Sequence, residues 1–319
     1  MSHSHTSAIC FDEATRDDAN NLISLALIED LGSAQPEYQK DITTESVVPE
    51  HVKGQATFVS REQGVLCGIR VVELILGQVN KDLELKICVE DGEKLKPGDA
   101  IAHLRGNAQD ILIAERTCLN FLGRLSGIST LTHRFLQQTQ ETEARILDTR
   151  KTTPGWRRLE KYAVRCGGGT NHRMGLFDAV LIKDNHLAML DILNDTPMNE
   201  IPSSINRARD WIVKHAAQLP EGQETIVQIE VDRLDQFEKA MKYCPDIILL
   251  DNMSNEELAQ AVTLRDQKNK SIQLEASGGV NLDTIGAIAQ TGVDRISVGA
   301  LTHSAVNFDI GLDWILEPQ

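Results

Sequence analysis

Short aliphatic runs alternate with helical patterns through the second half of this 319-residue chain, and no other feature of the sequence limits its fold as strongly. Six runs rich in Val, Ile and Leu are candidate strands, at 145–148, 179–182, 226–231, 247–250, 272–276 and 295–298. Helical spacing of apolar residues lies between most of them, at 205–218, 234–242, 256–265 and 282–290. Repeated strand–helix units predict a parallel sheet, either open or closed into a barrel.

Polar residues stand at the end of nearly every run, and their positions favour the barrel. They are Arg150 and Lys151, Lys183, Glu230, Asp251, the small residues 277–279, and Gly299. Active sites of parallel barrels are assembled from the carboxyl ends of several strands. We therefore expect one site at this end of the sheet, built from residues far apart in the sequence.

The first part of the chain has a different pattern. Its candidate elements are helices at 12–31, 71–79 and 109–137 and strands at 55–60, 64–68 and 83–89. The longest helix is expected to break near 125–127, where the sequence reads Leu-Ser-Gly. We expect a small α+β domain over 1–128 and the α/β barrel over 129–300.

Net charge and hydropathy exclude several classes of protein. The chain has 32 Lys and Arg against 47 Asp and Glu, a net charge of −15, which argues against broad binding to nucleic acid or to an anionic membrane. Apolar stretches such as 247–250 are far shorter than a membrane span, and residues 1–12 lack a secretory pattern. We expect a cytoplasmic protein with reduced cysteines.

Residues 145–186 reverse the charge balance, with nine basic side chains against four acidic ones. This segment is therefore +5, and the rest of the chain is −20. A basic segment in an acidic protein predicts a focused anion site. The stretch 156–165 is also typical of a solvent-exposed charged helix, which is the alternative for those residues.

Two loops in this segment carry groups suited to anions. Arg150 offers a planar fork and Lys151 a point charge, directly after a candidate strand and between hydroxyl residues. A glycine run at 167–169 permits close approach to a ligand, and His172 and Arg173 follow it. Cations that follow a strand often lie on the solvent-exposed surface. The two loops together with Lys183, however, predict a shared cationic pocket.

Two acids lie in or directly after apolar strands. Glu230 and Asp251 are costly there unless they are paired or bind a metal, so they suit Mg²⁺ or sugar hydroxyls. The alternative is an internal salt bridge to a nearby cation. The small residues at 277–279 and 299–300 suit the phosphate site that barrels build at their last loops, with simple tight turns as the alternative.

These motifs, in this number and order, resemble those of one family. They lie at 115–117, 125–130, 148–152, 171–173, 183–186, 230, 250–253, 276–279 and 299–303. With them the chain resembles the quinolinate phosphoribosyltransferases from about residue 12 to its C-terminus. The extra residues at 33–39 and 190–203 are interpreted as loop variation.

The resemblance implies a fold and an assembly. The fold is an N-terminal α+β sandwich-like domain followed by an incomplete α/β (TIM-like) barrel, with the tail 301–319 packing back on the N-terminal domain. The assembly is a homodimer whose active sites borrow a residue from the partner subunit.

The resemblance also assigns residues to ligands. The two carboxylates of quinolinate fall to Arg116, Thr149, Arg150, His172, Arg173 and Lys183, with Arg116 reaching in from the other subunit. The donor, phosphoribosyl diphosphate, falls to the catalytic residues Lys151, Glu230 and Asp251. The two acids among them also hold Mg²⁺, in part through water and donor oxygens. The donor's 5′-phosphate falls to Ser277, Gly278, Gly279, Gly299 and Ala300.

The implied reaction is phosphoribosyl transfer to quinolinate with decarboxylation, giving nicotinate mononucleotide, diphosphate and CO₂ in NAD biosynthesis. One alternative is a nicotinate-type phosphoribosyltransferase, which needs fewer cations and releases no CO₂. Another is a barrel that binds phosphorylated ligands without catalysis, which would have no need of Glu230 and Asp251.

Overall fold

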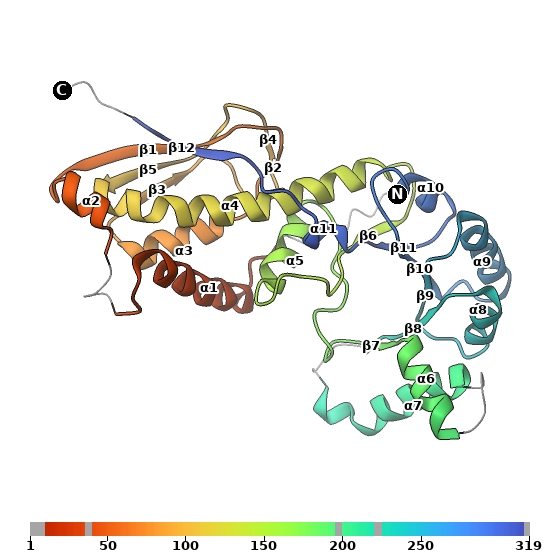
Figure 1. The fold of residues 1–319 in the computed structure, drawn as a ribbon. Coiled ribbons are helices and arrows are strands. Elements are labelled where there is room, and N and C mark those ends of the chain that lie inside the picture. The colour runs from red at the N-terminus through yellow and green to blue at the C-terminus, as the bar shows by residue number, and fades with distance from the viewer. Residues whose placement is uncertain (1–9, 36–39, 195–199, 220–224, 316–319) are drawn as a thin grey trace. The chain divides into compact units, whose positions relative to one another are not determined.

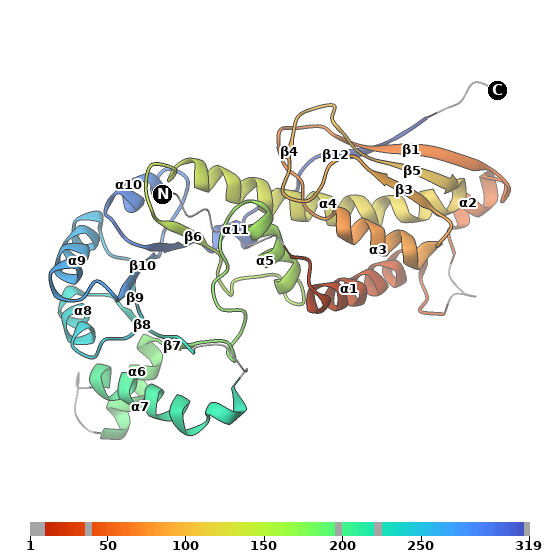
Figure 2. The same cartoon turned by 180° about the vertical axis from the view of Figure 1, so that it is seen from behind.

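The computed structural model of the chain describes residues 10–35, 40–194, 200–219 and 225–315. The chain divides into two compact units. The first comprises Met1–Arg134, Lys151–Gly169 and Leu301–Gln319, and the second comprises Phe135–Arg150 and Thr170–Ala300. Figures 1 and 2 show the elements of both units from opposite sides.

The first unit is an α+β structure built on an antiparallel sheet. Its elements are α1 (Glu13–Leu31), α2 (Ile42–Val47), β1 (Lys53–Ser60), β2 (Gly64–Val65), α3 (Ile69–Val79), β3 (Glu84–Ile87), β4 (Lys94–Leu95), β5 (Ala100–Asn107), α4 (Ala108–Gln137), α5 (Arg157–Cys166), α11 (Ala300–His303) and β12 (Ile310–Trp314). Strand order in the main sheet is β12-β1-β5-β3, and helices α3 and α4 cover one of its faces (Figures 1 and 2). The C-terminal tail therefore completes the sheet of the N-terminal unit.

The register of β1 on β5 explains which side of this sheet is buried. Phe58 pairs with Ala102, and both are fully buried. Thr57 pairs with His103 on the opposite face, where Thr57 Oγ1 lies 2.9 Å from His103 Nδ1. The alternation of the sequence thus produces one apolar and one polar face.

Helix α4 does not break at 125–127, contrary to the sequence prediction. The small residues there serve close packing instead. Ser126 Oγ lies 3.0 Å from both the backbone nitrogen and the carbonyl oxygen of Cys67. A Cβ on Gly127 would overlap the backbone carbonyl of Val306. Ser and Gly therefore mark where two neighbouring chain segments approach the helix.

The domain boundaries differ from those predicted at 128 and 129. Helix α4 continues past that point, and α5, which was placed in the barrel, belongs to the first unit. Arg158 Nε on α5 lies 3.2 Å from Asp18 Oδ2 on α1, and the Tyr162 ring makes an edge contact with Phe11, with ring centroids 5.1 Å apart. These contacts hold α5 against α1.

The second unit is a parallel α/β structure. Its elements are β6 (Arg145–Leu147), β7 (Val180–Ile182), α6 (Asp184–Asn194), α7 (Glu200–Lys214), a 3₁₀ turn η2 (Ala216–Gln218), β8 (Val227–Val231), α8 (Leu234–Met241), β9 (Ile247–Asp251), α9 (Asn255–Lys268), β10 (Gln273–Ser277), α10 (Ile285–Gln290) and β11 (Arg295–Ser297). Strand order is β6-β11-β10-β9-β8-β7, and every pairing is parallel.

This strand order is that of a barrel that is open between two of its strands, β6 and β7. The last strand, β11, pairs with the first, β6, whereas among the described residues β6 and β7 do not pair. Helices α7 to α10 lie on the outer side of the curved sheet (Figures 1 and 2). The incomplete α/β barrel is therefore confirmed. The short runs of the sequence were correctly predicted as its strands.

Two smaller expectations were wrong. The run 64–68 forms only the two-residue β2, because the amides of Gly68 and Ile69 turn to donate to Asp91 Oδ1 as α3 begins. The segment 190–203 is largely helix, since 190–194 close α6 and 200–203 open α7. Residues 195–199, like 36–39 and most of 1–12, lie outside the described set. Among the described residues, every helix is too short or too polar to span a lipid bilayer.

Candidate active site

The carboxyl ends of the parallel strands collect most of the predicted site residues in the second unit. These are Thr149, Arg150, His172, Arg173, Lys183, Glu230, Asp251, Ser277, Gly278, Gly279, Gly299 and Ala300. Two predicted residues, Arg116 and Lys151, belong to the first unit. Parallel pairing explains the first group, because it brings every strand end to one edge.

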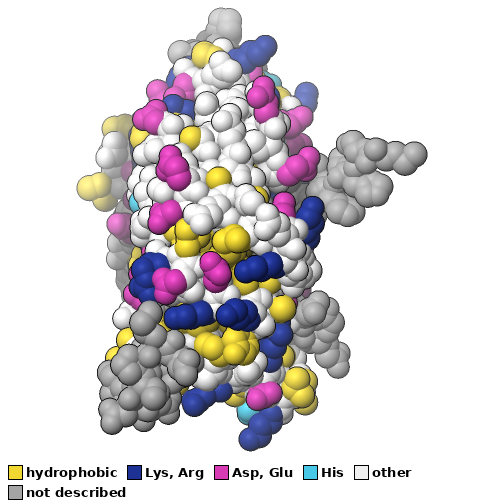
Figure 3. All heavy atoms as spheres, turned by 90° about the vertical axis from the view of Figure 1, so that its right-hand side faces the viewer, with side chains coloured by type: hydrophobic (Ala, Val, Ile, Leu, Met, Phe, Trp, Pro, Cys, Tyr) yellow, Lys and Arg dark blue, Asp and Glu magenta, His cyan; other side chains and the backbone are white. Residues whose placement is uncertain are grey.

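The basic segment 145–186 is divided between the two units. Five of its nine cations, Lys151, Arg157, Arg158, Lys161 and Arg165, lie in the first unit. Helix α5 is largely buried, and even Lys161 is only 1% exposed, so the alternative of a solvent-exposed helix at 156–165 is wrong. On the face shown in Figure 3, acidic and basic side chains lie beside one another. The cations at the strand ends of the second unit are Arg150, Arg173 and Lys183.

Lys183 and Glu230 form an ion pair at the ends of β7 and β8. The Lys183 ammonium donates to Glu230 Oε2, and the side chains are 42% and 13% exposed. The internal salt bridge considered for Glu230 is therefore present. It leaves the pair partly open to solvent, so that a ligand is able to reach both groups.

Asp251 is held by two hydrogen bonds at the end of β9. Ser277 Oγ, from the end of the paired strand β10, donates to Oδ1 at 2.5 Å. Asn252 Nδ2 donates to Oδ2 at 2.8 Å. Both donors are neutral, so the carboxylate is oriented while no positively charged side chain of the described residues is hydrogen-bonded to it.

A buried charge network lies one layer deeper. Glu275 on β10 is fully buried and accepts from Arg295 Nε at 2.8 Å, while His172 Nε2 lies 3.2 Å from its other oxygen. Burial by itself would raise the pKa of Glu275, but His172 and Arg295 outweigh it and lower the pKa to about 2. Glu230 was selected from the sequence because it is an acid in an apolar strand. Glu275 meets the same criterion, but the sequence prediction assigned it no function.

His172 uses both ring nitrogens within the protein. Nδ1 accepts from the Arg173 backbone amide at 2.7 Å, and Nε2 faces Glu275. Asp148, fully buried after β6, accepts from the His172 amide at 2.9 Å and from Asn171 Nδ2 at 2.5 Å. The loop carrying Arg173 is thus fixed from two sides. Asp148, Asn171 and Arg295 were also missed as positioning residues.

Arg173 is poised for an anion. Its Nη1 donates to the Ala179 carbonyl at 2.9 Å, and its buried Nε has no hydrogen-bond partner among the described residues. Burial and then the nearby positive charge of Arg150 lower the pKa of Arg173. Two cations that disfavour each other's charge are stabilised by an anion between them.

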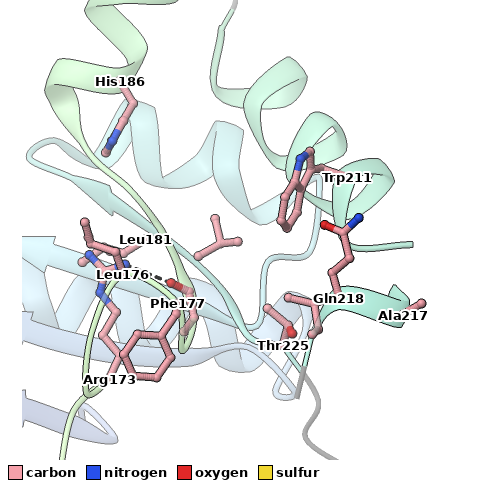
Figure 4. A pocket seen from close by; sticks show the side chains of 12 residues that line it. Arg173, Leu176, Phe177, Leu181, His186, Trp211, Ala217, Gln218 and Thr225 are labelled. Carbon is pink, nitrogen blue, oxygen red and sulfur yellow. Dashed lines mark hydrogen bonds between the residues drawn. The ribbon is translucent and has the colours of Figure 1, made fainter. Parts of the chain in front are cut away.

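A cavity of about 740 Å³ opens beside Arg173. Figure 4 shows Arg173 and Phe177 together on one side of it, with the hydrogen bond to Ala179 drawn, and Trp211 on the other. Leu181 and His186 also line it. Its volume lies in the range of small-molecule sites. Arg173 is the cation in its lining, which does not include Arg150, Lys183, Glu230 or Asp251.

Comparison with known proteins places the chain in a family. Residues 41–126 match the N-terminal domain, and residues 128–313 the C-terminal domain, of quinolinate phosphoribosyl transferase. The chain belongs to the quinolinate phosphoribosyltransferase family.

Individual members of this family are similar over nearly the whole chain. A nicotinate-nucleotide pyrophosphorylase [carboxylating] of Mycobacterium leprae is 40% identical over 93% of this chain and 97% of its own length. A quinolinate phosphoribosyltransferase [decarboxylating] of Nicotiana tabacum is 36% identical over 92% of this chain and 82% of its own length. The solved nicotinate-nucleotide pyrophosphorylase of Francisella tularensis superposes with a TM-score of 0.81 at 35% identity, covering 94% and 96% of the two chains.

The quinolinate phosphoribosyltransferase motifs are divided between the two units. Arg116 is exposed on α4, and the Lys151 carbonyl accepts from Thr302 Oγ1 at 2.7 Å. The chain leaves the second unit at Arg150 and enters the first at Lys151, so neighbouring residues of one motif belong to different units.

The described residues contain no group of three or more His, Cys, Asp or Glu side chains arranged to hold a metal ion. Glu230 and Asp251 do lie on neighbouring strands and on the same face, since Glu230 pairs with Leu249, two residues before Asp251. A pair of carboxylates suits a cation that brings its remaining oxygen ligands with it.

Proposed function

We propose that this chain transfers the phosphoribosyl group of phosphoribosyl diphosphate to quinolinate and releases diphosphate and CO₂, forming nicotinate mononucleotide. The observation that carries this proposal is the arrangement of Arg150, Arg173 and Lys183 with Glu230 and Asp251 at one edge of an open parallel barrel, in a chain of this family. Cations for a dicarboxylate and acids for a sugar–diphosphate donor stand in a single site.

The acceptor site falls to the cations. Quinolinate has two adjacent carboxylates, and Arg150, Arg173 and Lys183 offer charge-assisted hydrogen bonds to both, with Thr149 beside them. The unpartnered Nε of Arg173 supports a carboxylate contact at that atom. His172 binds through its ring only if the ligand replaces one of its present contacts. Otherwise it positions the Arg173 loop.

At the donor site Glu230 and Asp251 would hold Mg²⁺, and the family resemblance assigns Lys151 to the same donor. When bound, Mg²⁺ would neutralise charge on the leaving diphosphate. Glu230 and Asp251 face the ribose, where their negative charge favours the oxocarbenium-like state at the anomeric carbon. Gly279, with φ of +61° and open space where a Cβ would stand, leaves room for the 5′-phosphate, which Ser277, Gly278, Gly299 and Ala300 would also contact.

The chemistry follows from this placement. The pyridine nitrogen attacks the anomeric carbon as the bond to diphosphate breaks, and the leaving diphosphate takes the electron pair. The ring nitrogen is then quaternary and positively charged, so it stabilises the carbanion left when the adjacent carboxylate departs as CO₂. A proton completes the product. The protein's contribution is mainly orientation and electrostatic stabilisation.

The deciding assay supplies quinolinate, phosphoribosyl diphosphate and Mg²⁺ and follows both products. Diphosphate and CO₂ are expected in equal amounts. Turnover of nicotinate without CO₂ would replace this function by that of a nicotinate-type transferase. Binding of the donor with no turnover of either acid would leave a non-catalytic phosphate-binding barrel.

We further propose a homodimer in which Arg116 completes the partner's site. Arg116→Ala and Arg173→Ala subunits, each inactive alone, should regain activity when mixed, because one site of each mixed dimer then has neither lesion. Random mixing makes about half the dimers mixed, so about a quarter of wild-type activity is expected. Arg134→Ala, on the same helix, is the matched control. Confirmed mixed dimers without activity would place Arg116 outside the partner's site.

The proposed location is the cytoplasm. It agrees with the lack of a membrane-spanning helix among the described residues and with bacterial relatives whose names carry no organelle. Some plant relatives are named mitochondrial or chloroplastic. Cell fractionation of the native host tests it.

A further inference from the structure

Strand β9 is flanked by two residues with left-handed backbone conformation. Cys244 precedes the strand with φ of +48°, and Asn252 follows it with φ of +54°. They are the non-glycine residues with positive φ in the described part of the chain. Glycine adopts this conformation most readily, so a side chain retained there at the edge of a candidate site calls for a reason.

Three contacts lock Asn252 between the ends of β9 and β10. Its backbone amide donates to the Ser277 carbonyl at 2.9 Å, and its side-chain Nδ2 donates to Asp251 Oδ2 at 2.8 Å. Its Oδ1 fills the space that a Cβ on Gly278 would occupy. Gly278 therefore leaves room for the Asn252 amide, and that amide is turned toward Asp251.

The result is a carboxylate held on both oxygens. Ser277 Oγ donates to Asp251 Oδ1 at 2.5 Å while Asn252 donates to Oδ2. Two donors fix the plane of the carboxylate about its terminal torsion, which is otherwise broad. Each oxygen retains a further lone pair for a cation or a hydroxyl.

We propose that Asn252 is a positioning residue that sets the orientation of Asp251 toward the magnesium–diphosphate end of the donor. This inference rests on the proposed function, because it takes Asp251 to serve the donor. A purely conformational role for Asn252 would require only tolerance of φ at +54°, which glycine meets better than asparagine.

Asn252→Gly separates the two roles because it keeps the backbone conformation and removes only the amide. Loss of a hydrogen bond to a charged group predicts a rise of about ten- to a hundred-fold in the KM for phosphoribosyl diphosphate and in the Mg²⁺ concentration for half-maximal activity. The KM for quinolinate should stay within about twofold, since no acceptor contact is touched. Thermal unfolding should confirm a folded variant.

Cys244→Gly is the matched control at the other end of the same strand. It relieves the same backbone conformation but removes only Sγ contacts, at 3.6 Å to the Met241 carbonyl and 3.5 Å to Asn269 Nδ2. It should leave all kinetic constants unchanged. If it matched the kinetic loss of Asn252→Gly, the loss would be a general effect of glycine beside β9, and the proposal would fail.

Asn252→Asp gives an independent check, because aspartate tolerates the same backbone yet carries no N–H to donate. It should lose donor affinity at least as strongly, from repulsion of Asp251. Wild-type donor kinetics in either the Gly or the Asp variant would overturn the role of Asn252 and leave the proposed function standing. A wild type that neither binds nor uses phosphoribosyl diphosphate in calorimetry and turnover would overturn both.

Discussion

The two sheets of this chain treat polar side chains in opposite ways. The antiparallel sheet of the first unit buries an apolar face, as at Phe58, and turns its polar pairs, such as Thr57 and His103, to the other side. The parallel sheet of the second unit buries charge within the strands, with Glu275 fully covered between Arg295 and His172. One sheet is organised for folding, whereas the other accepts costly burial to orient a site.

The largest effect is expected at Glu275, where the roles of folding and orientation meet. Glu275→Ala leaves Arg295, whose side chain is 12% exposed, without its partner, which predicts a loss of about 3–5 kcal/mol in the free energy of unfolding. It also releases His172, so calorimetry should show weaker quinolinate binding. Unchanged stability and affinity would show that the buried pair is dispensable. Glu275→Gln, which keeps the shape and one acceptor, should be milder in both measurements.

Phe58→Ala tests the opposite side of the comparison. Removing a fully buried aromatic side chain predicts a loss of about 3–5 kcal/mol in urea unfolding, from lost burial and the cavity left behind. Quinolinate KM per folded molecule should not change. The control is Thr57→Ala on the opposite, polar face, where the loss of one neutral hydrogen bond predicts only about 1 kcal/mol. A specific change in KM would mean that the first sheet also shapes the acceptor site.

Arg173→Ala should do the reverse of Phe58→Ala. A charge-assisted carboxylate contact left unmade costs about 2–5 kcal/mol, so quinolinate affinity should fall about thirty-fold to several thousand-fold while the melting temperature changes little. Arg145→Ala, at the amino end of β6 and bonded to Gln273 at 3.1 Å, is the matched control. Unchanged affinity in Arg173→Ala would remove this residue from the acceptor site.

Acid should distinguish the units, because one carboxyl in each has its pKa shifted in the opposite direction. The pKa of Glu275 is lowered to about 2, so its stabilisation is present above its unfolded value near 4.5 and is lost as the pH falls toward 2. Burial raises the pKa of Asp91 in the first unit, against the hydrogen bonds from Ile69, Tyr162 and Gly68, so protonation of Asp91 favours folding.

Urea unfolding at a series of pH values from about 6 to about 3 measures this difference. Glu275→Gln should flatten the fall of stability with acid, because the group that loses its stabilisation is gone. Asp91→Asn should steepen it, because a compensating gain is removed. The same pH slope in both variants and the wild type would contradict these assignments.

The sequence predicted the barrel well because period and strand-end chemistry are local signals. Apolar runs such as 247–250, each followed by a polar residue, predict strands and strand ends whatever the order of the strands in the sheet. The break at 125–127 failed for a non-local reason, since Gly127 is required by the backbone of Val306, far along the chain. Small residues such as Ser126 and Gly127 are found both where helices break and where chain segments pack closely, so the sequence alone does not distinguish the two.

The sequence predicted the charged residues of the candidate site but not the residues that position them. Arg173, Glu230 and Asp251 stand out as charges beside apolar runs. Asp148 accepts from the backbone amide of His172, and Asn252 reaches Asp251 from a left-handed backbone conformation. Neither contact can be predicted before the pairing of the strands is known. The packing of 151–169 is equally non-local, since α5 packs on a helix more than a hundred residues earlier.

The placement of β12 bears on the order in which the protein is made. Strand β1 pairs with β5 on one side and with β12 on the other, and β12 ends at Trp314 in a chain of 319 residues. The whole second unit, including every barrel strand, is therefore translated before the first sheet receives its last strand. Until then β1 is an open edge, which is the kind of strand that pairs with other chains. A nascent chain stalled before residue 310 should expose this edge even though its barrel is complete.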